Sequence, residues 1–117
     1  MKNLLIIEED TDAREMMVFM FENNGYNVLQ AGKEISVEET AQLNPNLIIV
    51  GYQLGDTPGN DICLRLKGNE LTQPIPVILY SATSTVEKIS KGSSADAYVA
   101  KPLELEDFIW LVSRMAL

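Results

Sequence analysis

The sequence contains no histidine and only one cysteine, Cys63. Without histidine it lacks the commonest general base and the commonest metal ligand of proteins, which excludes hydrolases built on a Ser-His pair. A single cysteine cannot form an internal disulfide and agrees with a reducing cytoplasm, where we expect the protein to act. The longest apolar runs, such as residues 4–7 and 47–50, are far too short to cross a membrane. The first of them meets acidic residues at once, so we expect neither a signal peptide nor a membrane segment.

Basic residues are also scarce. Nine lysines and arginines stand against seventeen acidic residues, which gives a formal charge of −8. Nine of the acidic residues lie in the first forty positions. A surface this acidic repels phosphate backbones, so we expect no direct binding to nucleic acid. It would suit a cation or a basic protein surface, although solubility alone is a sufficient explanation.

What the chain does have is a regular alternation of short apolar runs and helical patterns. Its 117 residues suffice for one domain, 1–117, with a single core. Continuously apolar runs separated by helices indicate a parallel sheet covered on both faces, and hence a three-layer α/β sandwich. The expected strands are residues 3–7, 26–30, 47–50, 75–80 and a fifth within 95–101, and the expected helices are residues 11–25, 34–43, about 60–67 and 103–115.

Individual side chains refine these helices. Thr11 is the predicted N-cap of the first helix, whose apolar residues include Met16. A helix between the fourth and fifth strands has only Val86 and Ile89 as apolar anchors. Cys63 is expected to pack on an amphipathic helix. The last helix is predicted to place one group of residues on its apolar face and to pack Trp110 as well; the group is Leu105, Phe108, Ile109 and Val112.

In α/β sheets of this kind, functional residues gather at the carboxyl ends of the strands. The first strand ends in Glu8, Glu9 and Asp10, three adjacent carboxylates that repel one another unless they hold a cation or a basic partner. The alternative is a solvated turn that caps the first helix. The fourth strand ends near Ser81, which would donate to a bound anion or cap the next helix. The fifth ends in Lys101, which the following proline fixes in an extended conformation, so that its ammonium can point inward.

Taken in order, these strand ends resemble the receiver domain of two-component response regulators, over essentially the whole chain. LLIIEED resembles the first-strand motif with its acid pair, Glu8 and Glu9. YSA places Ser81 at the switch hydroxyl position, and ADAYVAKP places Tyr98 at the aromatic switch position and Lys101 at the lysine position. LIIVGYQLGDTPGNDICLRLK aligns with the third-strand segment. The resemblance implies a CheY-like, doubly wound, flavodoxin-like sheet of five parallel strands in the order 2-1-3-4-5.

The same resemblance places Gly51 where a receiver carries its phosphoacceptor aspartate. Glycine has no side chain, so no aspartyl phosphate can form there. In the family, the acid pair and this aspartate hold magnesium, while the lysine and the hydroxyl hold the phosphoryl group, and the reaction depends mostly on positioning and charge neutralisation. Further departures are two glutamates in the acid pair, Gly55 where the loop usually has proline, and a shortened segment 81–101. Together they favour a naturally divergent receiver, with an engineered substitution as the alternative.

Two expectations concern the pocket. Lys101 should pair with Glu8 or Glu9, since one negative charge fewer is present. Magnesium binding should be weak or absent, because only the two glutamates, the Gln53 backbone carbonyl and water remain as ligands, with Glu9 and Gln53 as the most suitable.

Ser81 and Tyr98 have two interpretations. In a receiver they would relay phosphorylation to the face formed by the fourth helix, fifth strand and fifth helix, so here they would form a fixed or partner-biased switch. The alternative is a capping serine and an aromatic side chain packed at a surface edge.

We therefore expect a non-enzymatic signalling module that works through protein contacts and needs no aspartyl phosphate. Its partner would be a histidine kinase, an output domain, another signalling protein or a second copy of the chain. The expected interaction face consists of Val86, Ile89, Tyr98, Phe108 and Trp110. Two alternatives are a receiver phosphorylated on another acid, Asp56, and an FMN-type binding module. The acidic loop after the first strand is hostile to phosphate and disfavours the flavin alternative.

Overall fold

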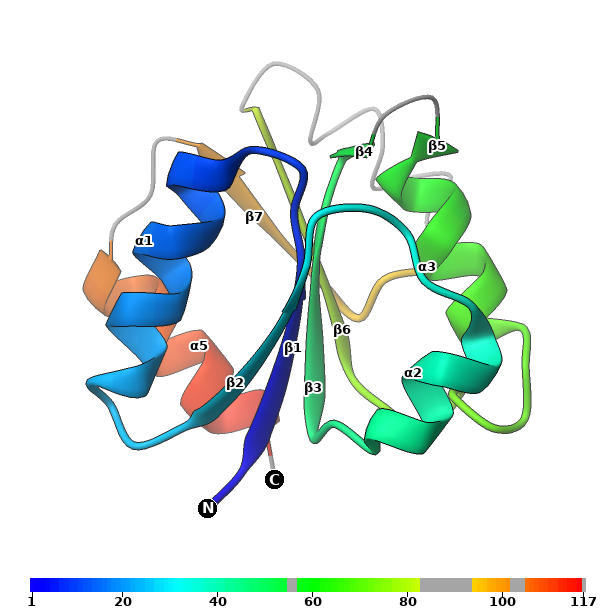
Figure 1. Ribbon diagram of the computed structural model, residues 1–117, viewed down its shortest axis with the longest axis horizontal. Coiled ribbons are helices and arrows are strands. Elements are labelled where there is room, and N and C mark those ends of the chain that lie inside the picture. Colours follow the sequence, from blue (N-terminus) through cyan, green and yellow to red (C-terminus); the bar gives the residue numbers. More distant parts are fainter. Residues whose placement is uncertain (55–56, 83–93, 102–104, 117) are drawn as a thin grey trace.

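The computed structural model describes residues 1–54, 57–82, 94–101 and 105–116. Five strands form one parallel sheet in the order β2-β1-β3-β6-β7, which is the predicted order, because β6 and β7 are the fourth and fifth parallel strands (Figure 1). Their bounds are β1 Asn3–Ile7, β2 Asn27–Ala31, β3 Leu47–Gly51, β6 Val77–Ala82 and β7 Ala97–Lys101. The expected second and fourth strands were therefore placed one to two residues too early.

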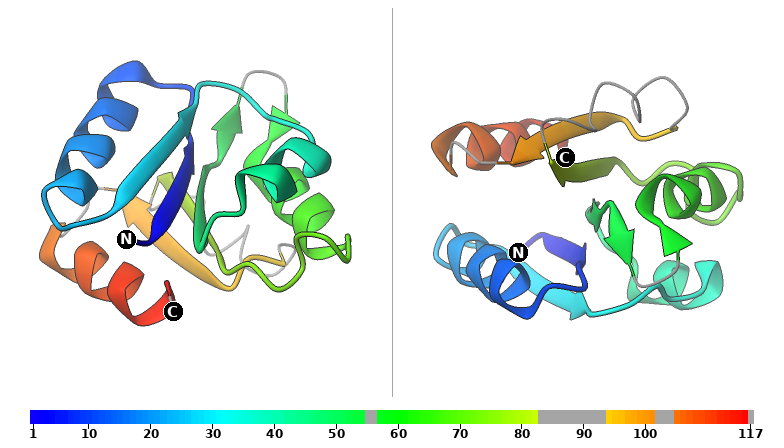
Figure 2. Two further views of the ribbon diagram at one scale, coloured as in Figure 1. Left: turned by 60° about the horizontal axis from the view of Figure 1, so that its bottom comes forward. Right: turned by 90° about the horizontal axis from the view of Figure 1, so that it is seen from above.

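Helices cover both faces of the sheet, as the alternating pattern predicted. Figures 1 and 2 show α1 and α5 on one face and α2 and α3 on the other. Their bounds are α1 Thr11–Glu22, α2 Val37–Leu43, α3 Gly59–Lys67 and α5 Leu105–Met115. No helix in the described part of the chain combines the length and apolar character that a membrane span requires. Val86, Ile89, Gly55 and Asp56 lie outside the described residues.

Between β3 and α3 the chain forms a small antiparallel pair that the sequence did not suggest. It consists of β4 Gln53–Leu54 and β5 Thr57–Pro58, with Gln53 opposite Pro58. Two-residue strands carry no hydrophobic alternation, so pattern analysis has nothing to detect there.

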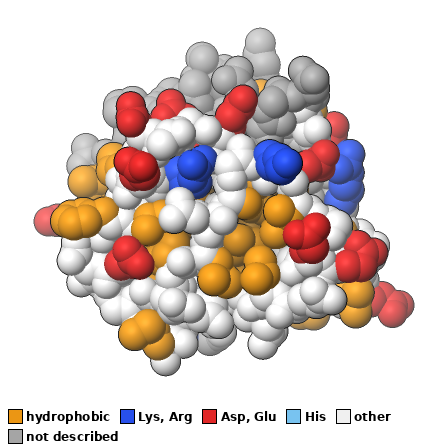
Figure 3. Space-filling model, viewed as in Figure 1, with side chains coloured by type: hydrophobic (Ala, Val, Ile, Leu, Met, Phe, Trp, Pro, Cys, Tyr) orange, Lys and Arg blue, Asp and Glu red, His pale blue; other side chains and the backbone are white. Residues whose placement is uncertain are grey.

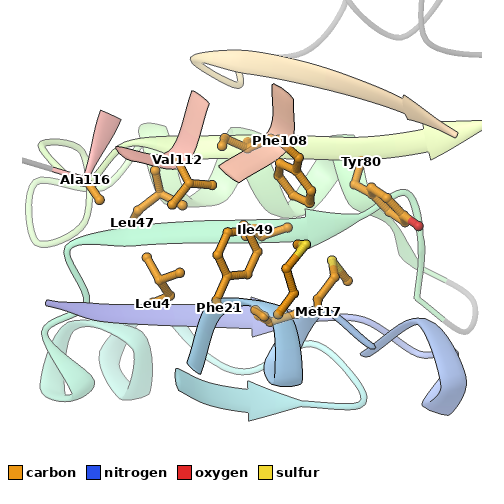
Figure 4. Close-up of a cluster of buried hydrophobic side chains, with 12 residues drawn as sticks. Leu4, Met17, Phe21, Leu47, Ile49, Tyr80, Phe108, Val112 and Ala116 are labelled. Carbon is orange, nitrogen blue, oxygen red and sulfur yellow. The ribbon is translucent and has the colours of Figure 1, made fainter. Parts of the chain in front are cut away.

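Two apolar clusters flank the sheet because successive strand residues point to opposite faces. Leu4 and Ile6 face α1 and α5, whereas Leu5 and Ile7 face α2 and α3. Figure 4 shows the first cluster, in which the Phe21 ring meets the Phe108 ring edge-on, with centroids 5.3 Å apart and an interplanar angle of 86°. Offset or edge-on aromatic pairs add stabilisation beyond the area that they bury.

The helix starts correct two predictions. Asp10, not Thr11, caps α1, because its Oδ1 accepts the backbone N–H of Ala13 at 3.1 Å. Ser36 caps α2 by accepting the N–H of Glu39 at 3.0 Å, so this helix begins three residues later than expected. Glu34 lies before the helix, where its carboxylate pairs with Arg65 at 2.5 Å.

The apolar faces were predicted only in part. Phe108 and Val112 are buried and Cys63 is fully buried, as expected. Met16 and Leu105 are instead exposed, and so is Trp110, with 62% of its surface accessible. On α5, Phe108 and Val112 lie one turn apart and are buried, and Ile109 is partly buried against the same core. Leu105 at the start of the helix and Trp110 on its far side do not reach the core.

Candidate functional site

The carboxyl ends of the parallel strands meet at the upper edge of the sheet in Figure 1. Because β1, β3 and β6 are neighbours, Glu8 directly after β1 lies next to Gly51 at the end of β3, and Gly51 is paired in register with Tyr80 of β6. Lys101 closes β7 opposite Ala82, but its side chain lies outside the description, as does its predicted pairing with a glutamate. Figure 3 shows acidic side chains near this edge and others lower on the same face.

The two glutamates of the acid pair lie in different environments. Glu8 is buried, with 4% of its surface exposed, whereas Glu9 is exposed. A Cβ added to Gly51 would lie 2.8 Å from Oε2, 3.0 Å from Cδ and 3.1 Å from Oε1 of Glu8. These distances are nearly equal, so the flat face of the carboxylate covers Gly51. The Glu8 carboxylate therefore occupies the space that a side chain at residue 51 would need.

Arg14 holds the backbone of the acidic turn, and the sequence analysis missed it. Its Nη1 donates to the carbonyl oxygen of Glu8 at 2.7 Å, and its Nε donates to Oε1 of Gln30 at 3.1 Å. The backbone N–H of Asp10 in turn donates to Oε2 of Glu8 at 3.3 Å. Arg14 is the only basic residue of α1 and lies in the turn of the helix that follows the acid pair, which is the sequence feature that could have identified it.

Tyr80 connects this acidic turn to the core. It is buried, and its ring stacks on Phe108 with centroids 6.4 Å apart. Burial raises the pKa of the Tyr80 phenol, and the negative charges of Glu8 and then Asp10 raise it further. Both causes disfavour the phenolate, so the hydroxyl stays protonated beside the acidic turn.

This raised pKa predicts a stability change in alkali. Above about pH 10 the unfolded chain releases the phenolic proton while the folded chain retains it, so the contribution of Tyr80 is complete below that pH and is lost as the pH rises through the folded-state pKa. Urea unfolding across this range should show the loss in the wild type and a smaller one in Tyr80→Phe. Equal pH slopes in the two proteins would contradict the assignment.

Ser81 and Tyr98 differ in their surroundings. Ser81 is buried and lies inside β6, one residue before its end, so it is not a helix N-cap and that alternative was wrong. Tyr98 of β7 is half-buried and packs against the cluster on the α2 and α3 face. This environment agrees with the interpretation of Tyr98 as an aromatic side chain packed at an edge.

The expected interaction face requires one correction. Phe108 is 2% exposed and belongs to the core, so it is not available to a partner. Trp110 is accessible, and the Arg114 guanidinium lies 5.7 Å from the centre of its ring.

The residues described here do not fit the magnesium ion that the resemblance implies. No three side chains of Asp, Glu, His or Cys come together in the described ranges to form a ligand set. Residue 51 has no side chain, and Glu9 is exposed.

Comparison with known proteins identifies the family to which this fold and its strand-end residues belong. The profile of the response regulator receiver domain matches residues 4–113. The chain belongs to this family. The DNA-binding dual master transcriptional regulator RpaA of Synechocystis is 33% identical over 112 residues, which cover 93% of this receiver domain and 46% of that protein. The receiver domain thus spans about half the length of such curated relatives.

Receiver domains similar to this one also occur in other contexts. A histidine kinase of Formosa agariphila is 29% identical over 110 residues, which cover 92% of this chain and 8% of the kinase. Among solved structures, a putative response regulator of Chloroflexus aurantiacus superposes with a TM-score of 0.83 at 25% identity, covering 98% of this receiver domain and 97% of that chain.

Proposed function

We propose that this receiver domain serves two-component signalling through protein contacts, without forming an aspartyl phosphate. The observation that carries the proposal is the buried Glu8 carboxylate lying over Gly51, where the resemblance places the phosphoacceptor. A phosphoryl group needs a nucleophile held in line with it, and no side chain at residue 51 can supply one. We expect binding rather than catalytic turnover from such a site.

We propose that the domain acts in the cytoplasm and that its partner is a histidine kinase, an output domain, another signalling protein or a second copy of the chain. Similar receiver domains are found in a transcriptional regulator and in a histidine kinase, which supports the first two. A formal charge of −8 suits a partner with a basic surface. Trp110 is the accessible aromatic residue on α5, and exposed tryptophan is a frequent anchor of protein interfaces.

A small phosphodonor tests the chemistry directly. The purified domain, incubated with acetyl phosphate and magnesium, should show no phosphorylated species by intact mass spectrometry, while a receiver with aspartate at this position is labelled alongside. Magnesium alone should give no saturable change of Trp110 fluorescence up to the low millimolar range. A mass increase of one phosphoryl group that hydroxylamine removes would reveal an acyl phosphate and overturn the proposal. Its loss in Asp56→Asn would identify Asp56 as the acceptor.

A further inference from the structure

We propose that Glu8 and Gly51 form one coupled unit, in which the Glu8 side chain after β1 occupies the space that a side chain at residue 51 of β3 would need. The inference deepens the proposed function and takes its functional meaning from it. Its physical content, the mutual dependence of the two residues, stands on the structure alone.

The first argument concerns why residue 51 is glycine. Its backbone φ lies outside the left-handed region, so strand geometry would accept any L-residue. Glycine within a strand weakens it relative to alanine, so its presence needs a local reason. The three atoms nearest to an added Cβ all belong to the Glu8 carboxylate, at 2.8–3.1 Å. Contact with Glu8 is therefore the reason for glycine that the structure supplies.

The second argument is that Gly51 cannot move away from Glu8. On the other side of its peptide, Gly59 packs so closely that an added Cβ there would lie 2.3 Å from the Gly51 carbonyl oxygen. The next residue, Tyr52, donates its N–H to the Tyr80 carbonyl at 2.9 Å and accepts the Gly59 N–H. The backbone at the end of β3 is thus fixed by β6 and by the start of α3. A side chain at residue 51 could be accommodated only if the Glu8 carboxylate moved away.

The third argument concerns charge. In a receiver the carboxylate at this position changes its charge and shape when it gains or loses a phosphoryl group. Here the carboxyl group belongs to Glu8, whose backbone carbonyl accepts from Arg14 at 2.7 Å and whose Oε2 accepts the Asp10 N–H at 3.3 Å. A carboxylate covering Gly51 leaves no room for a second one there. Residue 51 therefore offers no carboxylate that could gain or lose a phosphoryl group, which deprives the interaction face of a phosphorylation-driven switch.

A stability cycle tests the coupling without any phosphodonor, so this inference and the proposed function can fail separately. In the wild type, Gly51→Ala should lower the Tm by roughly 2–6 °C, because the Glu8 carboxylate has to turn away from the new Cβ. In a Glu8→Ala background the same change should raise the Tm by about 2–6 °C, because alanine is then better than glycine in the strand. A Glu9→Ala background is the matched control and should leave the wild-type effect of Gly51→Ala unchanged.

The criterion is the difference between the two Gly51→Ala effects. A difference of about 4 °C or more between the wild-type and Glu8→Ala backgrounds supports the coupling, and a smaller one overturns it. If Glu8→Ala does not fold, Gly51→Asp and Gly51→Asn decide, since they differ in charge but hardly in shape. At neutral pH Gly51→Asp should have the lower Tm, because its carboxylate would lie against that of Glu8, whereas the side-chain amide of Gly51→Asn can donate to it. Equal Tm values at neutral pH would contradict a carboxylate over residue 51.

Discussion

Replacing Gly59 with alanine should destabilise the domain by about 3 kcal/mol or more, at the upper end of what overpacking costs. The new Cβ would lie 2.3 Å from the Gly51 carbonyl oxygen, 2.8 Å from the Tyr52 Cα and 3.0 Å from the Gly51 carbonyl carbon. All three are backbone atoms, so no side-chain rotation can relieve the contact. The start of α3 would have to separate from the end of β3, which would also break the hydrogen bond between the Gly59 N–H and the Tyr52 carbonyl.

Gly25→Ala is the matched control for this experiment. Gly25 has a φ of 90°, but an added Cβ would meet no atom within 4 Å. Its replacement should cost about 1–2 kcal/mol, which reflects backbone conformation alone. Urea unfolding followed by circular dichroism and Trp110 fluorescence would compare the two variants. A loss in Gly59→Ala no greater than that in Gly25→Ala would mean that α3 does not pack this closely on β3.

Much of this architecture could be predicted from the sequence because it depends on pattern. The runs at residues 4–7 and 47–50 are apolar at every position, whereas a strand with one exposed face alternates apolar and polar residues. This pattern therefore predicted a parallel sheet with helices on both faces. The carboxyl ends of neighbouring parallel strands lie at one edge, which brings Glu8 next to Gly51. The family resemblance then identified the position that Gly51 occupies.

Side-chain direction, in contrast, could not be predicted. Whether Glu8 or Glu9 points into the protein depends on side-chain rotamers and on the hydrogen bond from Arg14 to the Glu8 carbonyl oxygen. A local sequence pattern predicts neither of them. From the sequence, Gly51 is a position without a side chain. The contact of the Glu8 carboxylate with this position depends on the three-dimensional path of the Glu8 side chain, which the sequence does not reveal.

Helix geometry alone contradicts the prediction that Phe108 and Trp110 share one interaction face. Successive helical residues are about 100° apart, so residues two apart lie on nearly opposite sides of a helix. If Trp110 is accessible, Phe108 must face the sheet. The structure agrees, since Phe108 is 2% exposed and Trp110 is 62% exposed.

Because Phe108 and Trp110 lie on opposite sides of α5, their replacement should affect stability very differently. Phe108→Ala should lose about 3–5 kcal/mol of unfolding free energy, because it removes a ring that meets Phe21 edge-on and stacks on Tyr80. Trp110→Ala should lose no more than about 1 kcal/mol, mostly from its contact with Arg114. Urea unfolding followed by circular dichroism measures both, since it does not depend on the tryptophan.

The two variants also separate folding from binding. If α5 presents Trp110 to a partner, Trp110→Ala should weaken the complex while the domain keeps its stability, whereas Phe108→Ala should affect binding only as far as it unfolds the domain. Similar unfolding free energies for both variants would show that α5 does not dock through Phe108. In that case the register of the helix on the sheet, and with it the exposure of Trp110, would have to be reconsidered.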